Sequence, residues 1–457
     1  SSSSKKRGPG QSLSLIAQDA MGAAVHDFIQ ETATPTQVEV AAQILEKCSP
    51  GRMASGRTGR HRPRPRRAGR RLNDDSATIP CSTDLSQTDV EDVLKMMKAS
   101  VGNPQVQEKG CESLKRLAAD HEGQEEVAHH GGITAVVKAM EHHKVTGVQL
   151  AALNCLEKLI ASNPTTGSAM VEANGIEAVE AAMRLDPSKV EVQMAGCKIL
   201  CSIAMCDAQR QEKVAKSGAA QAVLDAMRAH SSIAAVQELG CQALKEFAAY
   251  NAESQEDIYM RGGIQVVLRA MEAHPEVLNL QVLGCGVLRN LAACNSEQQQ
   301  AVVSRGGIQV VLDAMTSHSS QSSMQWAGCW TLFCLCVHNA EMRCEVAAYG
   351  AARVALKALE AHRADHRAQE AGCWLLKELA EHMATAKDRA TFSAAIQAAL
   401  KALEKHPGNT AVQKAARSAL QNLSAFDKEG WVKMACLGRC GRLGRTATMR
   451  TLEAIQE

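Results

Sequence analysis

The stretch SEQQQAVVSRGGIQVVLDAMTSHSSQSSMQWAGCWTLFCLCVHNA at residues 296–340 decides the fold. Residues 296–304 read as a short helical turn that ends at the glycine pair Gly306-Gly307. Glycine tolerates a positive φ, so the next helix can leave at a sharp angle. The residues after the pair place apolar side chains at the three- and four-residue spacing of an amphipathic helix. We therefore predict two helices in succession, the second ending near His318.

A third helix is predicted after the serines that follow the second one. It begins near Ser323 and carries one apolar stripe. The stripe consists of Gln325, Gly328, Cys329, Leu332 and Leu335. A glycine inside a helix costs about 1 kcal/mol relative to alanine, and a Gly-Cys pair recurs at this place in most units. The repeated glycine indicates that a neighbouring helix comes close at this point.

This unit repeats along most of the chain. One glutamine position recurs with a first step of 42 residues and six further steps of 44, and a leucine follows seven residues after each glutamine. The glutamines are Gln107, Gln149, Gln193, Gln237, Gln281, Gln325, Gln369 and Gln413. A constant period of roughly 40–47 residues is typical of a helical solenoid. The sequence therefore predicts an all-α, right-handed α-solenoid of about eight three-helix repeats.

The repeat resembles a known family. GGIQVVLRAM at residues 262–271, LQVLGCGVLRNLA at residues 280–292 and their counterparts in residues 86–426 are similar to the armadillo repeat, with Cys in place of the usual Ala. The 44-residue step resembles the armadillo region of leucine-rich-repeat kinases. The resemblance implies a concave groove, lined by the third helices, that holds an extended peptide. We therefore expect a non-enzymatic scaffold that binds protein segments.

In importin-like members of that family, a Trp and an Asn one turn apart on a third helix hold a nuclear localisation peptide. The corresponding positions here include Trp330, Trp374 and Asn290, but no third helix carries both residue types. The resemblance therefore disfavours a nuclear-import adaptor.

A cluster of tryptophans is the strongest candidate site. Trp326 and Trp330 are one turn apart, and Trp374 repeats the position of Trp330 one unit later, in a chain that is 3% aromatic. Tryptophan is enriched among interface hot spots and binds cations over its ring. Packing of one or more of these rings between helices is the alternative. The residues expected to contact a partner are Trp326, Trp330, Trp374, Asn290, Glu370, Glu378, Glu246 and Gln242. With Glu370 and Glu378 as an acidic edge, we expect a basic or apolar peptide.

The cysteines and histidines form ladders that resemble metal sites. Equivalent positions in a solenoid lie about one repeat, roughly 10 Å, apart, whereas a disulfide needs Cα atoms within about 7 Å and zinc needs ligands within roughly 2.1 Å of one point. We therefore predict buried free thiols, histidines that favour helix C-termini, a reducing compartment, and neither metal nor cofactor. The histidines are His143, His230, His274, His318, His362 and His406.

The two ends leave the 44-residue register. Residues 1–50 contain two short amphipathic segments, interpreted as a decayed repeat; residues 51–80 are an Arg-rich disordered linker; residues 81–426 are the array; and residues 427–457 are a cap or tail. Residues 1–80 carry 13 Lys/Arg against 7 Asp/Glu, whereas residues 81–426 carry 32 against 38. The start lacks Met and an apolar segment, which indicates a fragment or a processed chain and leaves a transit segment open.

The Arg-rich linker supplies the alternative function. Its arginines could bind nucleic acid nonspecifically, bind an acidic surface, or serve as a nuclear localisation signal; a solvated linker is the plain reading. The residues in question are Arg62, Arg64, Arg66, Arg67, Arg70 and Arg71. No P-loop, Gly-x-Ser-x-Gly or His-Glu-x-x-His motif and no run of 18 apolar residues occurs. We therefore expect a monomeric cytoplasmic protein, nuclear under the alternative, that is not an enzyme.

Overall fold

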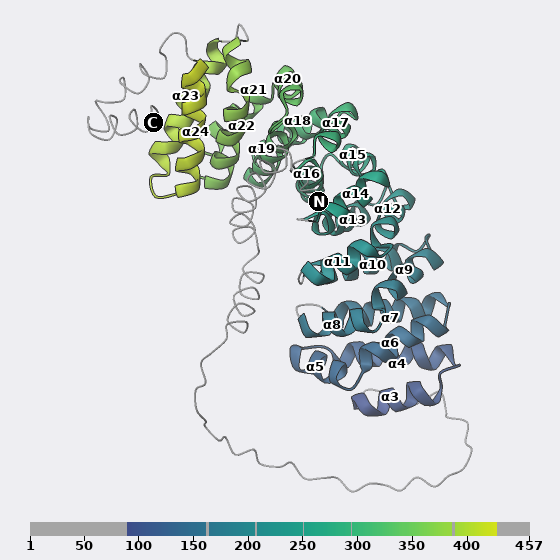
Figure 1. Cartoon of the computed structure of the whole chain (residues 1–457). Helices are drawn as coiled ribbons and strands as arrows, with labels where there is room; N and C mark the ends of the chain where they lie inside the picture. Colours follow the sequence, from purple (N-terminus) through teal and green to yellow (C-terminus); the bar gives the residue numbers. More distant parts are fainter. Residues whose placement is uncertain are drawn as a thin grey trace, which may run out of the picture. The chain divides into compact units, whose positions relative to one another are not determined.

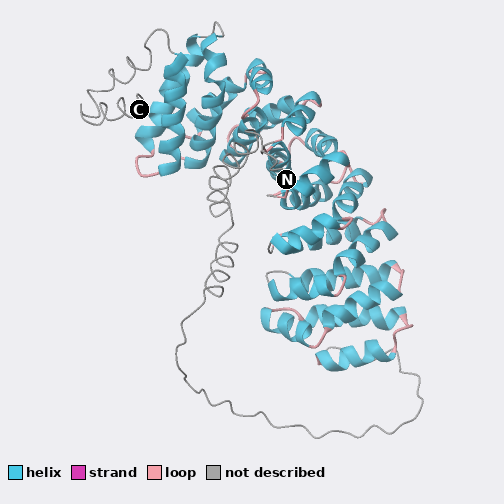
Figure 2. Cartoon of the chain, viewed as in Figure 1, coloured by secondary structure: helices cyan, strands magenta, loops and turns pink. Residues whose placement is uncertain are grey.

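The computed structural model describes residues 89–160, 164–205, 208–249, 251–293, 295–385 and 389–426. The chain divides into two units, Ser1–Gln87 and Thr88–Glu457, and all described residues belong to the second. They form 22 α-helices and no strand, α3 to α24 in Figure 1. Figure 2 shows helices joined by short loops throughout this part. The predictions for residues 1–80, including the Arg-rich linker, and for residues 427–457 lie outside the described residues.

The helices follow one another in units of three, as the sequence period predicts. The first described pair is α3 (Val90–Ala99) and α4 (Pro104–Leu117). Six full units follow: α5 (His121–His129), α6 (Gly132–His142), α7 (Thr146–Ile160); α8 (Pro164–Glu172), α9 (Gly175–Leu185), α10 (Val190–Ala204); α11 (Ala208–Lys216), α12 (Ala219–Ala229), α13 (Ala234–Ala248); α14 (Ala252–Met260), α15 (Gly263–Ala273), α16 (Leu278–Ala292); α17 (Ser296–Ser304), α18 (Gly307–Ser317), α19 (Ser322–Cys336); and α20 (Ala340–Ala348), α21 (Ala351–Ala361), α22 (His366–Thr385). The array ends with α23 (Arg389–Lys405) and α24 (Thr410–Phe426). The eight glutamines thus mark eight units, six of them described with three helices.

The last unit has two helices because its turn residue differs. Gly306 and Gly350 separate the first and second helices of their units with φ of 83° and 79°. Forty-four residues after Gly350 stands Ala394, and a side chain disfavours the left-handed region. The helix therefore continues through this point as α23.

The repeated glutamine joins the second helix of a unit to the third. Gln281, 2% exposed, donates from Nε2 to the carbonyl oxygens of Met271 and His274, both at 2.9 Å. The other seven glutamines donate to the equivalent pair of carbonyls at the end of their own second helix. These bonds satisfy carbonyls that a helix end leaves without an intrahelical donor.

The glycine of the Gly-Cys pair accommodates the methionine that ends the second helix. A Cβ added at Gly328 would lie 2.4 Å from Cγ of Met315, and Gly196, Gly240 and Gly284 meet their methionines in the same way. The predicted close approach of a neighbouring helix is therefore confirmed. The eight ladder leucines beside these contacts are all buried, at 0% exposure.

The histidine ladder joins neighbouring units. His318 Nε2 donates to the Pro275 carbonyl at 2.8 Å, and His362 Nε2 donates to the Ser319 carbonyl at 2.8 Å, each 43 residues back in the chain. His143, His230, His274 and His406 make the equivalent bond. The predicted structural role is confirmed, although the bond is to the preceding unit rather than to the helix dipole.

The cysteines that share one repeat position are buried free thiols, as predicted. These ladder cysteines are Cys111, Cys197, Cys241, Cys285, Cys329 and Cys373. Burial raises the pKa of Cys197, Cys285 and Cys329 to about 12. Cys344, outside the ladder, is exposed. Within the described ranges, no group of three or more His, Cys, Asp or Glu could hold a metal ion. In the same ranges no helix has the length and apolar character to cross a membrane.

Candidate functional site

The three tryptophans of α19 and α22 lie on one surface, and none is fully buried. Trp326, Trp330 and Trp374 are each partly exposed. Phe333, 8% exposed, connects two of them: its ring centroid is 5.3 Å from Trp330 in an edge-to-face contact and 6.2 Å from Trp374. Such ring pairs are favoured beyond the area they bury. We call Trp326, Trp330, Trp374 and Phe333 the tryptophan surface.

Helix packing explains why these rings meet. α19 and α22 are third helices of successive units and pack directly against each other. Trp330 and Trp374 hold the same position in their units, so both rings emerge on the same side of the layer. Phe333 is three residues after Trp330 and turns towards the next third helix.

Three cations lie against the tryptophan rings. The guanidinium carbons of Arg289 and Arg367 are 6.0 and 5.9 Å from the Trp326 ring centroid, and Nζ of Lys377 is 5.2 Å from that of Trp374. These distances are within the roughly 6 Å range of cation–π attraction. The cations come from α16 and α22, the third helices on either side of α19.

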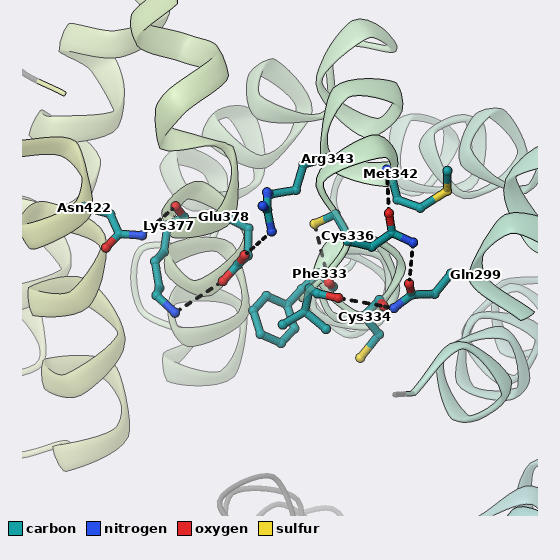
Figure 3. Close-up of polar contacts among 11 residues, drawn as sticks. Gln299, Phe333, Cys334, Cys336, Met342, Arg343, Lys377, Glu378 and Asn422 are labelled. Carbon is teal, nitrogen blue, oxygen red and sulfur yellow. Dashed lines mark hydrogen bonds and ion pairs between the residues drawn. The ribbon is translucent and has the colours of Figure 1, made fainter. Parts of the chain in front are cut away.

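The acidic edge predicted at Glu370 and Glu378 does not leave the surface acidic. The Glu378 carboxylate, 11% exposed, lies 3.2 Å from Nζ of Lys377 and 3.7 Å from Arg343. Figure 3 shows both cationic side chains reaching this carboxylate, Arg343 from α20 and Lys377 from the same helix. Glu370 is half-buried one turn before Trp374. We expected a basic partner because of this acidic edge. The negative charge of Glu370 and Glu378 is, however, more than balanced by neighbouring cations.

The remaining candidate residues lie apart from the tryptophans or bond within the array. Asn290 donates from Nδ2 to the Lys245 carbonyl at 3.0 Å, which joins α16 to α13. Asn422 makes the same contact with the Lys377 carbonyl at 3.2 Å (Figure 3). Gln242 and Glu246 are half-buried on α13, with α16 between them and α19. The structure therefore brings Trp326, Trp330, Trp374, Glu370 and Glu378 together, and places Gln242 and Glu246 elsewhere.

A second feature, which the candidate list did not include, lies on α4 and α7. Glu112, Lys115, Arg116, Ala119 and Lys158 line an open depression of about 570 Å³. Three of its four charged residues are cationic. Arg116 and Lys158 are one 42-residue step apart and so hold equivalent positions in their units, but this spacing does not predict a depression between them.

The comparisons with known proteins agree with this architecture. The family model for the LRRK2 ARM repeat matches residues 171–394, from the end of α8 to the first part of α23. The array is built of armadillo-like repeats. No curated protein matches it.

Several solved structures are similar to this array at low sequence identity. An engineered protein solved by the Northeast Structural Genomics Consortium is 20% identical over 81% of this chain and 99% of its own, with a TM-score of 0.54. A designed armadillo repeat protein in complex with the peptide (KR)4 is 15% identical over 54% of this chain and 100% of its own, with a TM-score of 0.47. A β-catenin structure, from work on its interaction with cadherin, is 16% identical over 78% of this chain and 75% of its own, with a TM-score of 0.46.

Proposed function

We propose that this armadillo array is a non-enzymatic scaffold that binds a segment of another protein along its third helices. The tryptophan surface is the main contact in this proposal. The armadillo fold supports the class of function, because its third helices offer a continuous row of side chains to an extended peptide.

One observation carries the proposal. Three large aromatic side chains stay partly exposed on two adjacent third helices, in a chain with four tryptophans in all. Exposed apolar groups that lie side by side are typical of interaction sites, whereas scattered ones need no explanation. Phe333 packs between two of the rings and holds them in place, so a partner would meet a preformed surface.

Affinity capture with the full chain, followed by mass spectrometry and titration of the recovered partner, tests the proposal. Trp330→Ala and Trp374→Ala should each weaken binding about 30-fold or more, the effect of removing a hot-spot residue worth about 2 kcal/mol. Tyr349→Ala is the matched control, since Tyr349 is an aromatic residue 46% exposed at the end of α20. The proposal is wrong if both tryptophan variants, shown to be folded by circular dichroism, bind every recovered partner as the parent chain does.

The Arg-rich segment at residues 52–71 supports a second candidate, a nuclear or nucleic-acid-associated adaptor. Nine arginines without interleaved aromatic residues would attract phosphates without sequence preference. Deleting residues 52–71 should then abolish binding to a random-sequence DNA duplex, and binding by the intact chain should fall steeply with salt. Binding that survives the deletion would exclude this role. A cytoplasmic location belongs to the first proposal and a nuclear one to the second.

A further inference from the structure

We propose that the segment bound at the tryptophan surface is acidic, with Asp or Glu side chains beside bulky apolar ones. The inference rests on the proposed function and adds the sign of the partner's charge. Its starting point is the set of cations around the rings. Arg289 and Arg367 flank Trp326, and Lys377 lies over Trp374.

The tryptophan surface has more cationic than acidic side chains, whereas the array as a whole has more acidic ones. Four cations lie around the rings and Glu378, against three carboxylates. The cations are Arg289, Arg343, Arg367 and Lys377, and the carboxylates are Glu370, Glu378 and Asp365, the last of which lies near Arg367. Residues 81–426 as a whole carry 32 Lys/Arg against 38 Asp/Glu. A local positive excess within an acidic array is therefore a property of this surface and not of the average composition.

The position of the cations works against a basic partner. The face of an indole ring attracts a cation, but the chain's own Arg or Lys already lies near two of these rings. A lysine or arginine from a partner would have to displace that group and would meet like charges, which is unfavourable across an interface.

An acidic segment fits the same groups. A carboxylate can accept two parallel N–H bonds from one guanidinium, and arginine keeps this capacity while its planar group lies near an aromatic ring. Arg289 and Arg367 are both partly exposed. Arg289 already donates from Nε and Nη2 to Asn290 Oδ1 at 3.3 and 3.2 Å, so Arg367 is the better placed of the two to bind a carboxylate of a docking segment. Apolar side chains of the segment would cover Trp330 and Trp374 and displace water from this surface. The removal of water would strengthen the neighbouring ion pairs.

The depression on α4 and α7 is a second surface at which acidic ligands would bind. It also carries an excess of cations, with Lys115, Arg116 and Lys158 against Glu112. A test must therefore separate the two surfaces by matched charge reversals. The pair Arg367→Glu and Lys377→Glu changes the tryptophan surface, and the pair Lys115→Glu and Lys158→Glu makes the same change of charge in the depression.

The experiment selects random 12-residue displayed peptides on the full chain, with counter-selection on the Trp330→Ala/Trp374→Ala variant. Enriched peptides are then titrated by fluorescence polarisation. We expect enriched sequences with a net negative charge, binding about tenfold weaker to Arg367→Glu/Lys377→Glu, and no comparable change in Lys115→Glu/Lys158→Glu. A factor of this size follows from replacing attraction by repulsion at two partly exposed positions.

Three results would overturn the inference. Only the last of them would also overturn the proposed function. Tryptophan-dependent peptides that are neutral or basic would refute the acidic partner and leave the proposed function standing. A charge preference that follows Lys115 and Lys158 would move the acidic contact to the depression, with the same consequence. If no peptide distinguishes the parent chain from the tryptophan variant, the proposed function fails and the charge inference fails with it.

Discussion

Replacing Gln281 by methionine tests whether the repeated glutamine stabilises the array. Methionine keeps the unbranched shape and a similar helix propensity but has no N–H donor. The change removes the bonds to the Met271 and His274 carbonyls, both 2.9 Å long. Pro275, four residues after Met271, has no N–H to take the place of the glutamine. The His274 carbonyl still accepts from Val277 N at 3.2 Å.

The magnitude follows from this difference between the two carbonyls. A buried carbonyl left without a donor costs about 1–3 kcal/mol, and loss of the second bond costs about 0.5–1.5 kcal/mol. We therefore expect Gln281→Met to lower the free energy of unfolding by about 1.5–4.5 kcal/mol. Urea unfolding followed by far-UV circular dichroism measures this loss.

Gln309→Met is the matched control. Gln309 is exposed on α18 and bonds only to the exposed Asp313, at 2.7 Å, in the contacts seen for its amide. Exposed substitutions of this kind change stability by about 0.5 kcal/mol or less. If Gln281→Met and Gln309→Met unfold at the same urea concentration with the same slope, the proposed role of the glutamine is wrong.

Three further predictions concern the same repeat contacts. His318→Ala removes the 2.8 Å bond to the Pro275 carbonyl and should cost about 1 kcal/mol, seen as a lower Tm, whereas the exposed His142→Ala should leave Tm unchanged. Gly328→Ala should destabilise the chain by about 1–3 kcal/mol in urea because its Cβ would lie 2.4 Å from Met315, while Gly102→Ala, with nothing within 4 Å, should not. Burial raises the pKa of Cys197 to about 12 from an ordinary value of 9.0, so the stability this thiol contributes is complete below pH 9 and falls as pH rises towards 12. At pH 10 the loss is on the order of 1 kcal/mol for such a thiol, and Cys197→Ala should reduce the decline between pH 8 and pH 10 by a similar amount; an unchanged decline would contradict the assignment.

The period of the sequence was enough to predict the units, because a constant spacing shows which side chains share a face. It also predicted the close approach at Gly328, since a glycine repeated inside a helix needs a steric reason. The role of the glutamine was not predictable in the same way. Its acceptors are backbone carbonyls of Met271 and His274, and their direction depends on the turn geometry after the second helix.

The sequence predicted the tryptophans of the tryptophan surface, but it did not predict Phe333 or the cations around the rings. Trp330 and Trp374 share a repeat position, whereas Phe333 lies off that position and faces the next unit. The surrounding cations come from two units, Arg289 from the unit ending in α16 and the other three from the unit α20 to α22, so their balance against the carboxylates depends on how neighbouring helices pack. The three-residue step from Trp330 to Phe333 was the available signal, because it places both rings on adjoining faces of one helix.

The central claim is that a partner segment lies on the third helices at the tryptophan surface. Photo-crosslinking tests it most directly, with p-benzoylphenylalanine in place of Ser418, which holds the Trp374 position in the next unit on α24, or in place of Ser317, exposed on the second helix α18. We predict that the recovered partner is crosslinked from position 418 and not from position 317. Crosslinking from position 317 alone, or equally from both, would contradict the account.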